Sequence, residues 1–420
     1  MIKLGTVFSG IGSIEQALNR LNVAHELVFA CDNGDIELSL LDRSTQKEFK
    51  LLQTKRGKRS LTPSEQQRLN ELSKKENEIA EETRNYIYSL QNKLEKMDYV
   101  EALYRNNGRR ENHVRSTYLA NYPSVQDFHL DIRFLDGKDY QNKVNLIVGG
   151  SPCQAFSTVG AQNGLDDTRG TLFYEFARII NEIKPRAFIF ENVKGLTTHN
   201  DGKTWETIKH VFTDVLHYRI TEPQLLNASD YGIPQTRRRV FVVGIRDDIK
   251  CKPFEYPQPI GCQYTMMDFL EENCAPGCFT YNPDGSIHVE KKAGDRQRID
   301  KYVLTPKVRD YVLAGGTKNF KTSTKTDLPI ARTLLKTMTQ HHRAGIDNYI
   351  TVGIDDEGNK KLRALTDREC LRLMGYSDNF RIVVSPMQVY RQAGNSIVVD
   401  VMMAVMKELI RTGVFINGDS

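Results

Sequence analysis

Apolar runs alternate with stretches of helical periodicity through much of the chain. Short, nearly uninterrupted apolar runs, typical of buried strands, occur at 3–8, 26–31, 144–148, 187–190 and 239–245. Segments with helical spacing lie between them, at 14–21, 171–183 and 205–216. Near-continuous apolar strands that alternate with helices predict an α/β domain with a parallel sheet covered by helices on both faces.

Residues 35–113 interrupt this alternation with a polar segment rich in Lys, Glu, Gln and Asn. Thr62-Pro63-Ser64-Glu65 is a capping box with proline at the first helical position, which predicts a helix start. The apolar residues from Leu69 to Tyr104 follow one heptad seam, which Glu76, Thr83 and Lys93 interrupt. The seam predicts a helix of about 42 residues, roughly 60 Å long. With a shorter helix expected over 37–52, we predict an inserted helical hairpin arm that is dispensable for folding.

The remaining segments suggest how the chain is divided into domains. Residues 251–330 mix Pro, Gly, aromatic and polar residues without periodicity, which predicts a smaller, irregular domain. Residues 331–389 are interpreted as a hinge and return segment, and an apolar helix is expected over 398–410. The main domain would comprise 1–34 and 114–250, completed by 390–420.

Composition narrows the class of protein. The 420 residues are 39% hydrophobic and 26% charged, enough for a sizeable core. No apolar run is long enough for a membrane-spanning helix, the N-terminus does not resemble a signal peptide, and seven cysteines do not suggest a disulfide framework. A cytoplasmic location is therefore expected. The net charge is +5, with a surplus of four basic residues between Asp42 and Asn112, which only weakly suggests a polyanionic partner.

The first turn resembles a nucleotide-binding turn. Ser9-Gly10-Ile11-Gly12 follows the first strand, where glycines let a ligand approach the backbone and the next helix N-terminus. The turn would equally serve to tighten a strand–helix junction. Asp32 ends the second strand, where an acid commonly binds ribose hydroxyls or caps a helix.

Further candidate groups follow later strands. Cys153 lies in Gly149-Gly150-Ser151-Pro152-Cys153-Gln154, just past a buried strand, and is either a nucleophile or a small buried residue. Glu191 lies at the end of another strand. It would act as an acid or hydrogen-bonding group, or it would cap the next helix. Arg237 and Arg239 enter a buried strand, where they would bind a substrate oxygen or pair with an acid such as Glu191.

Ordered motifs along the chain resemble those of the cytosine-C5 DNA methyltransferase family. They are FSGIG, Asp32, Asp131-Ile132, GGSPCQAFS, DDTRGTLF, FENVKGL, NASDYGIPQTRRRVF, LTDRECLRLMGY and QAGNSIVVDVM. The resemblance covers about 1–33, 114–250 and 330–405. It implies a Rossmann-like S-adenosylmethionine-dependent methyltransferase sheet, a small target-recognition domain at 251–330, and release of S-adenosylhomocysteine as product.

The resemblance also implies roles for individual residues. Cys153 would be the nucleophile, Glu191 would bind cytosine N3 and the amino group, Arg237 would hold the base's O2, and Arg239 would support the site. The residues expected around S-adenosylmethionine are Phe8, Ser9, Gly10, Ile11, Gly12, Asp32, Asn33, Asp131, Ile132, Gly150, Pro152, Leu172, Asn395 and Ser396. Two positions depart from the family pattern: Ser13 replaces a frequent glycine, and Asn33 replaces a large side chain.

The expected activity is sequence-specific methylation of cytosine C5 in double-stranded DNA, with the target base flipped out of the helix. DNA contacts are expected from Gln154, Ser157, Arg169, Arg296 and Arg298. We expect a monomer on DNA, with a cognate restriction endonuclease as a candidate partner, no membrane contact and no metal. Two alternatives stay open: a DNA-binding regulator that has lost catalysis, and a tRNA cytosine methyltransferase.

Overall fold

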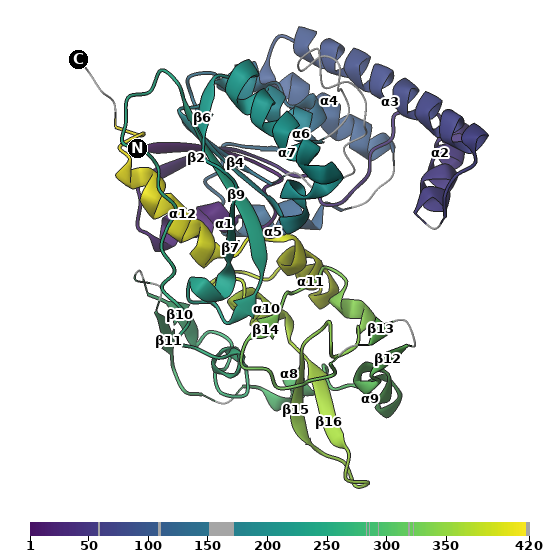
Figure 1. Ribbon diagram of the computed structural model, residues 1–420, viewed down its shortest axis with the longest axis vertical. Coiled ribbons are helices and arrows are strands. Elements are labelled where there is room, and N and C mark those ends of the chain that lie inside the picture. Colours follow the sequence, from purple (N-terminus) through teal and green to yellow (C-terminus); the bar gives the residue numbers. More distant parts are fainter. Residues whose placement is uncertain are drawn as a thin grey trace.

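The protein has an upper lobe built on one large sheet and a lower lobe of short strands and helices, as Figure 1 shows. The computed structural model describes residues 1–57, 59–107, 111–150, 172–282, 284, 286–292, 294–317, 320–321 and 323–416. Among these residues, no helix combines the length and the apolar character needed to cross a membrane.

The main sheet has the strand order β3-β2-β1-β4-β5-β9-β6, with β7 also paired to β9. Its strands are β1 (Ile2–Val7), β2 (His25–Cys31), β3 (Asp127–His129), β4 (Leu146–Gly149), β5 (Ala187–Val193), β6 (Tyr218–Ile220), β7 (Gln224–Asn227) and β9 (Arg238–Arg246). The first five strands are parallel, as predicted, but β9 runs antiparallel to β5, β6 and β7. A fully parallel sheet was therefore wrong, because a continuous apolar run indicates burial on both faces and not the direction of the strand.

Helices cover both faces of this sheet, as predicted. One face packs against α1 (Ser13–Arg20), α5 (His113–Asn121) and α12 (Val399–Arg411), and the other against α6 (Leu172–Ile183) and α7 (Lys203–His210). Arg20 and Asp400 form a buried ion pair with contacts of 2.8 and 2.9 Å, which ties the first helix to the last.

The inserted segment forms three helices, α2 (Arg43–Arg56), α3 (Pro63–Ser89) and α4 (Lys93–Asn106). The capping box at Thr62 and Glu65 is confirmed. The prediction of a single long helix was wrong. The backbone becomes extended at Leu90, which ends α3. Asn92 then caps α4 by accepting a hydrogen bond from the Glu95 amide. Helix α2, which was expected over 37–52, starts later than predicted because Asp42 caps it.

The inserted segment consists of two parts with different packing. In the outer arm, which we define as residues 42–75, Leu52, Leu69 and Leu72 form a small core of their own. In the inner arm, residues 76–107, Ile87 and Val100 belong to the main core. This packing argues against the expectation that the whole arm is dispensable, and that expectation is kept as a prediction for the outer arm alone.

The inner arm is also held to the rest of the upper lobe by charge. Lys96 pairs with Asp136 at 2.7 Å and with Asp139 at 3.0 Å, and Arg84 of α3 pairs with Glu175 of α6 at 2.9 Å. These contacts make the inner arm a structural part of the upper lobe.

The lower lobe and the return segment contain mostly short elements. They are β10 (Phe279–Tyr281), β11 (Ile287–Val289), α8 (Arg296–Asp300), α9 (Pro306–Leu313), β12 (Gly316–Thr317), β13 (Phe320–Lys321), β14 (Ala331–Arg332), β15 (Tyr349–Ile354), β16 (Lys360–Ala364), α10 (Asp367–Arg372) and α11 (Pro386–Asn395). Val312 packs with Tyr349 and Leu362, so the segment after 330 also contributes to this lobe. Strand β14 pairs with β8 (Gln235–Thr236), next to the start of β9.

Candidate active site

The predicted site residues follow the carboxyl ends of neighbouring strands. Asp32 follows β2, Gly150 follows β4 and Glu191 lies near the end of β5, while the glycine turn follows β1. Because these parallel strands are adjacent in the sheet, their ends meet along one edge, where ligand sites of open α/β sheets are found.

The turn after β1 has a backbone that requires glycine. Gly10 and Gly12 have φ of 54° and 82°, and Phe8 also adopts a positive φ of 54°. A Cβ added at Gly12 would lie 2.2 Å from the Tyr122 ring, whereas one at Gly10 would meet no atom within 4 Å. Ser9 ties the turn to β2 by accepting a 2.9 Å hydrogen bond from the Cys31 amide. The turn therefore presents backbone to an open space at Gly10.

Asp32 joins this turn to the loop after β2. One carboxylate oxygen accepts a 2.8 Å hydrogen bond from the Gly10 amide, and the other accepts one of 2.8 Å from the Gly34 amide. Burial raises the pKa of Asp32, while the two amides oppose that rise. Asn33 is exposed and accepts a hydrogen bond from the Asp35 amide, so its side chain serves its own loop.

Asp131 is bound by a residue of the inserted segment. It accepts hydrogen bonds from the Tyr104 hydroxyl of α4 at 2.9 Å and from the Arg133 guanidinium at 2.7 Å. Ile132 is buried and starts a short 3-10 turn, for which Asp131 is the cap. The contact from Tyr104 was not foreseen, because the heptad pattern placed Tyr104 only on an apolar seam.

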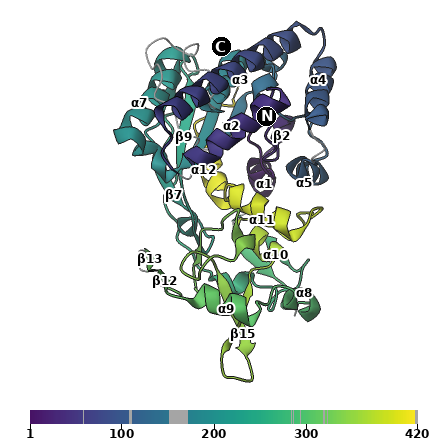
Figure 2. The same cartoon turned by 90° about the vertical axis from the view of Figure 1, so that its right-hand side faces the viewer.

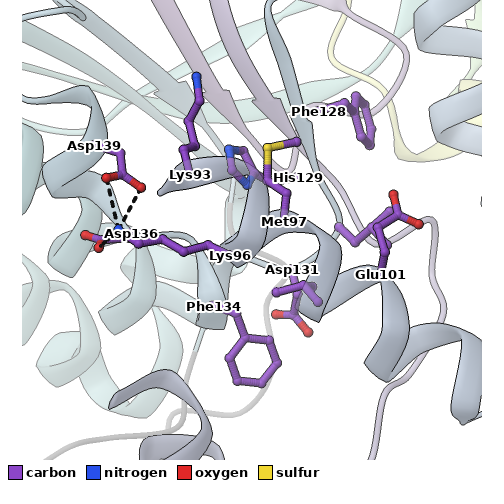
Figure 3. A pocket seen from close by; sticks show the side chains of 12 residues that line it. Lys93, Lys96, Met97, Glu101, Phe128, His129, Asp131, Phe134, Asp136 and Asp139 are labelled. Carbon is purple, nitrogen blue, oxygen red and sulfur yellow. Dashed lines mark hydrogen bonds and ion pairs between the residues drawn. The ribbon is translucent and has the colours of Figure 1, made fainter. Parts of the chain in front are cut away.

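A cavity lies beside Asp131, between α4 and the loop after β3 (Figure 3). Lys96 spans its wall toward Asp136 and Asp139. The cavity has a volume of about 20 Å³, which leaves room for little more than one ordered water. It is therefore a packing gap and not a ligand site.

Glu191 and Arg239 form an ion pair between β5 and β9, with Oε1 and Nε 3.1 Å apart. Arg239 lies opposite Val193 in the antiparallel register, which places it diagonal to Glu191 on the same face. Burial raises the pKa of Glu191, and the charges of Arg239 and Arg237 oppose that rise. The carboxyl group is therefore suited to hold a proton more readily than an exposed glutamate.

Gly150 allows the close approach of Glu191. A Cβ at Gly150 would lie 2.5 Å from Glu191 Oε2, so a side chain at Gly150 would displace the carboxylate. The strand that leads toward Cys153 thus passes directly beside the acid on the neighbouring strand.

Arg237 is almost fully buried and binds the return segment. Its terminal nitrogens donate to the carbonyls of Leu334, Gly394 and Ser396 at 2.7–3.0 Å. Burial and the nearby charge of Arg239 lower the pKa of Arg237 to about 9, while Glu191 raises it. Its Nε has no hydrogen-bond partner among the described residues.

A cluster of three hydroxyl groups joins the first helix to the segment around Asn395 and Ser396. Ser13 Oγ lies 2.8 Å from Ser396 Oγ and 3.0 Å from the Tyr376 hydroxyl. Asn395 donates to Asp35 at 3.2 Å, in the loop after β2. The serine that departs from the family pattern at position 13 therefore has a bonded role, which no local sequence signal indicated.

The comparisons with known proteins agree with this geometry. The family described as C-5 cytosine-specific DNA methylase matches residues 110–411. The chain belongs to this family. The methylase is 32% identical over 310 residues to the type II methyltransferase M.HpaII of Haemophilus parainfluenzae, covering 71% of this chain and 80% of that protein. It is 33% identical over 267 residues to M.HhaI of Haemophilus parahaemolyticus, covering 62% and 74% of the two chains.

Solved structures share the fold of the methylase. The Dnmt2 methyltransferase of S. pombe matches with a TM-score of 0.58 and 16% identity, covering 98% of each chain. A putative DNA modification methyltransferase encoded within an E. coli prophage matches with a TM-score of 0.55 and 18% identity, covering 98% of this chain and 99% of that one. The enzyme is a DNA (cytosine-5) methyltransferase, and its fold is that of these α/β methyltransferases.

Several predicted residues of the methylase lie outside the described residues. They are Pro152, Cys153, Gln154, Ser157 and Arg169. Leu172 begins α6 and packs against the apolar core on the sheet face that α6 and α7 cover.

Two arginines predicted to contact DNA differ in their surroundings. Arg296 is exposed at the start of α8, whereas Arg298 pairs with Glu271 at 3.2 Å and with Asp367. These pairs favour a structural role for Arg298. Among the described side chains, no group of three or more His, Cys, Asp and Glu is arranged to hold a metal ion.

Proposed function

We propose that the methylase flips a target cytosine out of duplex DNA, adds the Cys153 thiolate to C6 and methylates C5. The observation that carries this proposal is the placement of Glu191. It lies half-buried beside Gly150 and pairs with Arg239, and the charge of Arg237 acts on it. Cys153 follows Gly150 by three residues in the sequence. An acid and a nucleophile on adjacent strand ends suit an attack on one ring.

The first turn and Asp32 fit S-adenosylmethionine as the methyl donor. Gly10 adjoins open space, and Asp32 is held beside it with lone pairs left to accept from ribose hydroxyls. Asp131 and Ile132, the Asn395–Ser396 segment and Leu172 are proposed to complete the site. The bound donor supplies an electrophilic methyl group on a sulfonium sulfur.

The protein residues make cytosine C5 nucleophilic. Thiolate addition at C6 moves the 5,6 double bond to C4–C5 and the electron pair of the N3–C4 double bond onto N3, where Glu191 delivers a proton. The product is an enamine with a nucleophilic C5. C5 then takes the methyl group. Loss of the C5 proton to a base, expulsion of the Cys153 thiolate and return of the N3 proton to Glu191 restore the ring and the enzyme. The raised pKa of Glu191 supports its role as the proton donor.

Arg237 is proposed to bind the O2 of the flipped base. Its Nε, which has no hydrogen-bond partner among the described residues, is proposed as the donor for that contact, while the other nitrogens fix the guanidinium to three carbonyls. Arg239 is proposed to hold Glu191 in position through their ion pair.

Sequence recognition is assigned to the lower lobe, with exposed Arg296 as a candidate contact. The resemblance to type II methyltransferases supports a role in a restriction–modification system, with a cognate endonuclease as partner, and we propose that one monomer acts on DNA.

The test combines covalent trapping with sequencing. Duplex DNA carrying 5-fluorocytosine at the target should trap a covalent complex, because fluorine cannot leave C5 as a proton. Cys153→Ser should form no complex and transfer no methyl group, since a serine hydroxyl is far less ionised than a thiol. Cys251→Ser, at a half-buried cysteine elsewhere, serves as the control. The target itself comes from methylome sequencing of DNA from cells that express the protein. Full turnover by Cys153→Ser would contradict the mechanism.

A further inference from the structure

The first helix of the outer arm carries a concentrated positive charge. Helix α2 contains five basic residues and one acidic residue, whereas α3 contains four basic and six acidic residues. Helix α2 therefore has four more basic than acidic residues, whereas α3 has two more acidic than basic ones.

The outward face of α2 is a basic stripe, which we define as Arg43, Lys47 and Lys50. At 100° per residue these three lie within an arc of about 60°, on the side opposite Leu52, which packs into the small core against α3. All three are exposed. They span about 10 Å along the helix axis, comparable to about three successive phosphates of one DNA strand.

The acidic residues near α2 leave the basic stripe largely free. Glu48, the one acid of the helix, is bound by Arg68 of α3 at 2.9 Å. Lys50 has only a 3.9 Å contact with Glu37, and both side chains are about half exposed or more. Such an exposed pair exchanges readily with another anion.

The root of the outer arm lies at the catalytic edge of the sheet. The loop from Asp32 to Asp42 leads directly into α2, and Asp35 within it contacts Asn395 at 3.2 Å and Lys336 at 3.9 Å. In Figure 1, α2 lies on the same side of the molecule as β12, β13 and α9 of the lower lobe. Figure 2 shows it at the front of the upper lobe, above α9 and β15.

We propose that the basic stripe binds the phosphate backbone of the DNA duplex that flanks the target site. The inference rests on the proposed function, because it takes the duplex that carries the target cytosine to be the partner of the stripe. Charge complementarity selects the occupant: three exposed cations on one face of a helix suit a regular row of phosphates. The contact would lengthen the footprint without reading bases.

The experiment compares Arg43→Gln/Lys47→Gln/Lys50→Gln with the wild type on a duplex of about 40 base pairs and a minimal one of about 14, across a salt series. The triple variant should bind the long duplex on the order of tenfold more weakly at about 100 mM salt, with the slope of log K against log salt reduced by about 0.9 per lost contact. Binding to the minimal duplex, methylation specificity and S-adenosylmethionine binding should be unchanged.

A matched control is Lys250→Gln/Lys252→Gln/Lys407→Gln, three exposed lysines near the end of β9 and on α12. It should behave as the wild type, and a thermal melt of both variants checks folding. Lys47→Glu alone should shift the long-duplex affinity in the same direction as the triple variant.

Unchanged affinity and salt slope in the triple variant would overturn the inference. A changed methylation site would also overturn it, because it would assign base reading to α2. If the wild type neither methylates nor binds any duplex, the proposed function is overturned. If the wild type methylates DNA and the triple variant binds the long duplex equally well, only the inference about the basic stripe is overturned.

Discussion

Glu191 on β5 and Arg239 on β9 form an ion pair 3.1 Å long across the antiparallel boundary of an otherwise parallel sheet. The reversed strand places the arginine on the same face as the acid, at the strand ends where the site is built. The pair balances the burial of Glu191: burial raises its pKa and the arginine opposes that rise. This balance leads to two predictions.

Glu191→Gln should slow methyl transfer about 10²–10⁴-fold while leaving DNA affinity nearly unchanged, because an amide cannot deliver a proton to N3. Protonated Glu191 is the active form, so the wild-type rate should fall as pH rises through its pKa, and the variant should lack that falling limb. Single-turnover rates over a pH series measure both effects. Glu222→Gln, at an exposed acid, is the control. A loss confined to DNA binding would make Glu191 a positioning residue only.

Arg239→Gln should move the falling limb of the pH profile to higher pH. The substitution removes the positive charge that favours ionised Glu191, so the pKa of the acid rises further. We expect the rate at neutral pH to fall by about tenfold or more because the carboxyl group also loses its fixed position. The same single-turnover series tests this. A profile that keeps its midpoint would show that Arg239 does not control the ionisation of Glu191.

A third prediction concerns Glu15, which is fully buried in α1. It accepts a hydrogen bond from Tyr118 and one of 3.2 Å from Thr6, but its Oε2 has no partner among the described residues. Burial raises the pKa of Glu15 from 4.5 to about 7. An acid with a raised folded pKa stabilises the fold below its unfolded pKa, and this stability is lost as pH rises toward 7.

Glu15→Gln should therefore reduce the pH dependence of folding. Between pH 5 and pH 8 the wild type should lose roughly 2–3 kcal/mol more of its free energy of unfolding than the variant does. Urea unfolding at the two pH values measures the difference. Glu290→Gln, at an exposed acid, should follow the wild type. Parallel pH curves for Glu15→Gln and wild type would mean that Glu15 ionises normally in the folded protein.

Local patterns predicted most of the sheet and the residues at its edge. Continuous apolar runs located β1, β2, β4, β5 and β9, and the glycine turn with Asp32 was placed correctly because both depend on neighbouring residues. An ion pair between Arg239 and Glu191 was one of the two interpretations open from sequence. These features follow from burial and from backbone conformation, which short segments determine.

Other features depend on contacts between distant segments and could not be predicted. The hydroxyl cluster joins Ser13 to Tyr376 and Ser396. Tyr104, in α4 of the inserted segment, donates a hydrogen bond to Asp131. The break at Leu90 lies within a heptad pattern that resumes after the interruption at Lys93, because the chain turns there and α4 packs against the main core. Packing of this kind overrides helix propensity.

The last prediction uses the two parts of the inserted segment. Glu76 of α3 accepts hydrogen bonds from the Ser39 hydroxyl at 3.0 Å and from the Leu40 amide at 2.9 Å. These contacts bring the two ends of the outer arm together. Replacing 43–74 with a short Gly/Ser linker should therefore leave a folded enzyme that binds S-adenosylmethionine, with a melting temperature close to that of the wild type.

Removing the whole segment 42–110 should instead prevent folding. It would uncover the positions of Ile87 and Val100 in the main core, each worth about 1.5–3 kcal/mol when buried. It would also strip Lys96 from buried Asp136, and loss of one partner of a buried pair costs about 3–5 kcal/mol. Together these losses approach the roughly 5–15 kcal/mol that stabilises a typical domain. Soluble yield and thermal melts of the two deletions, made in parallel, decide the matter. A folded full deletion would show that the inner arm is only docked on the catalytic lobe, whereas an insoluble outer deletion would show that the small core around Leu52 supports the rest of α3.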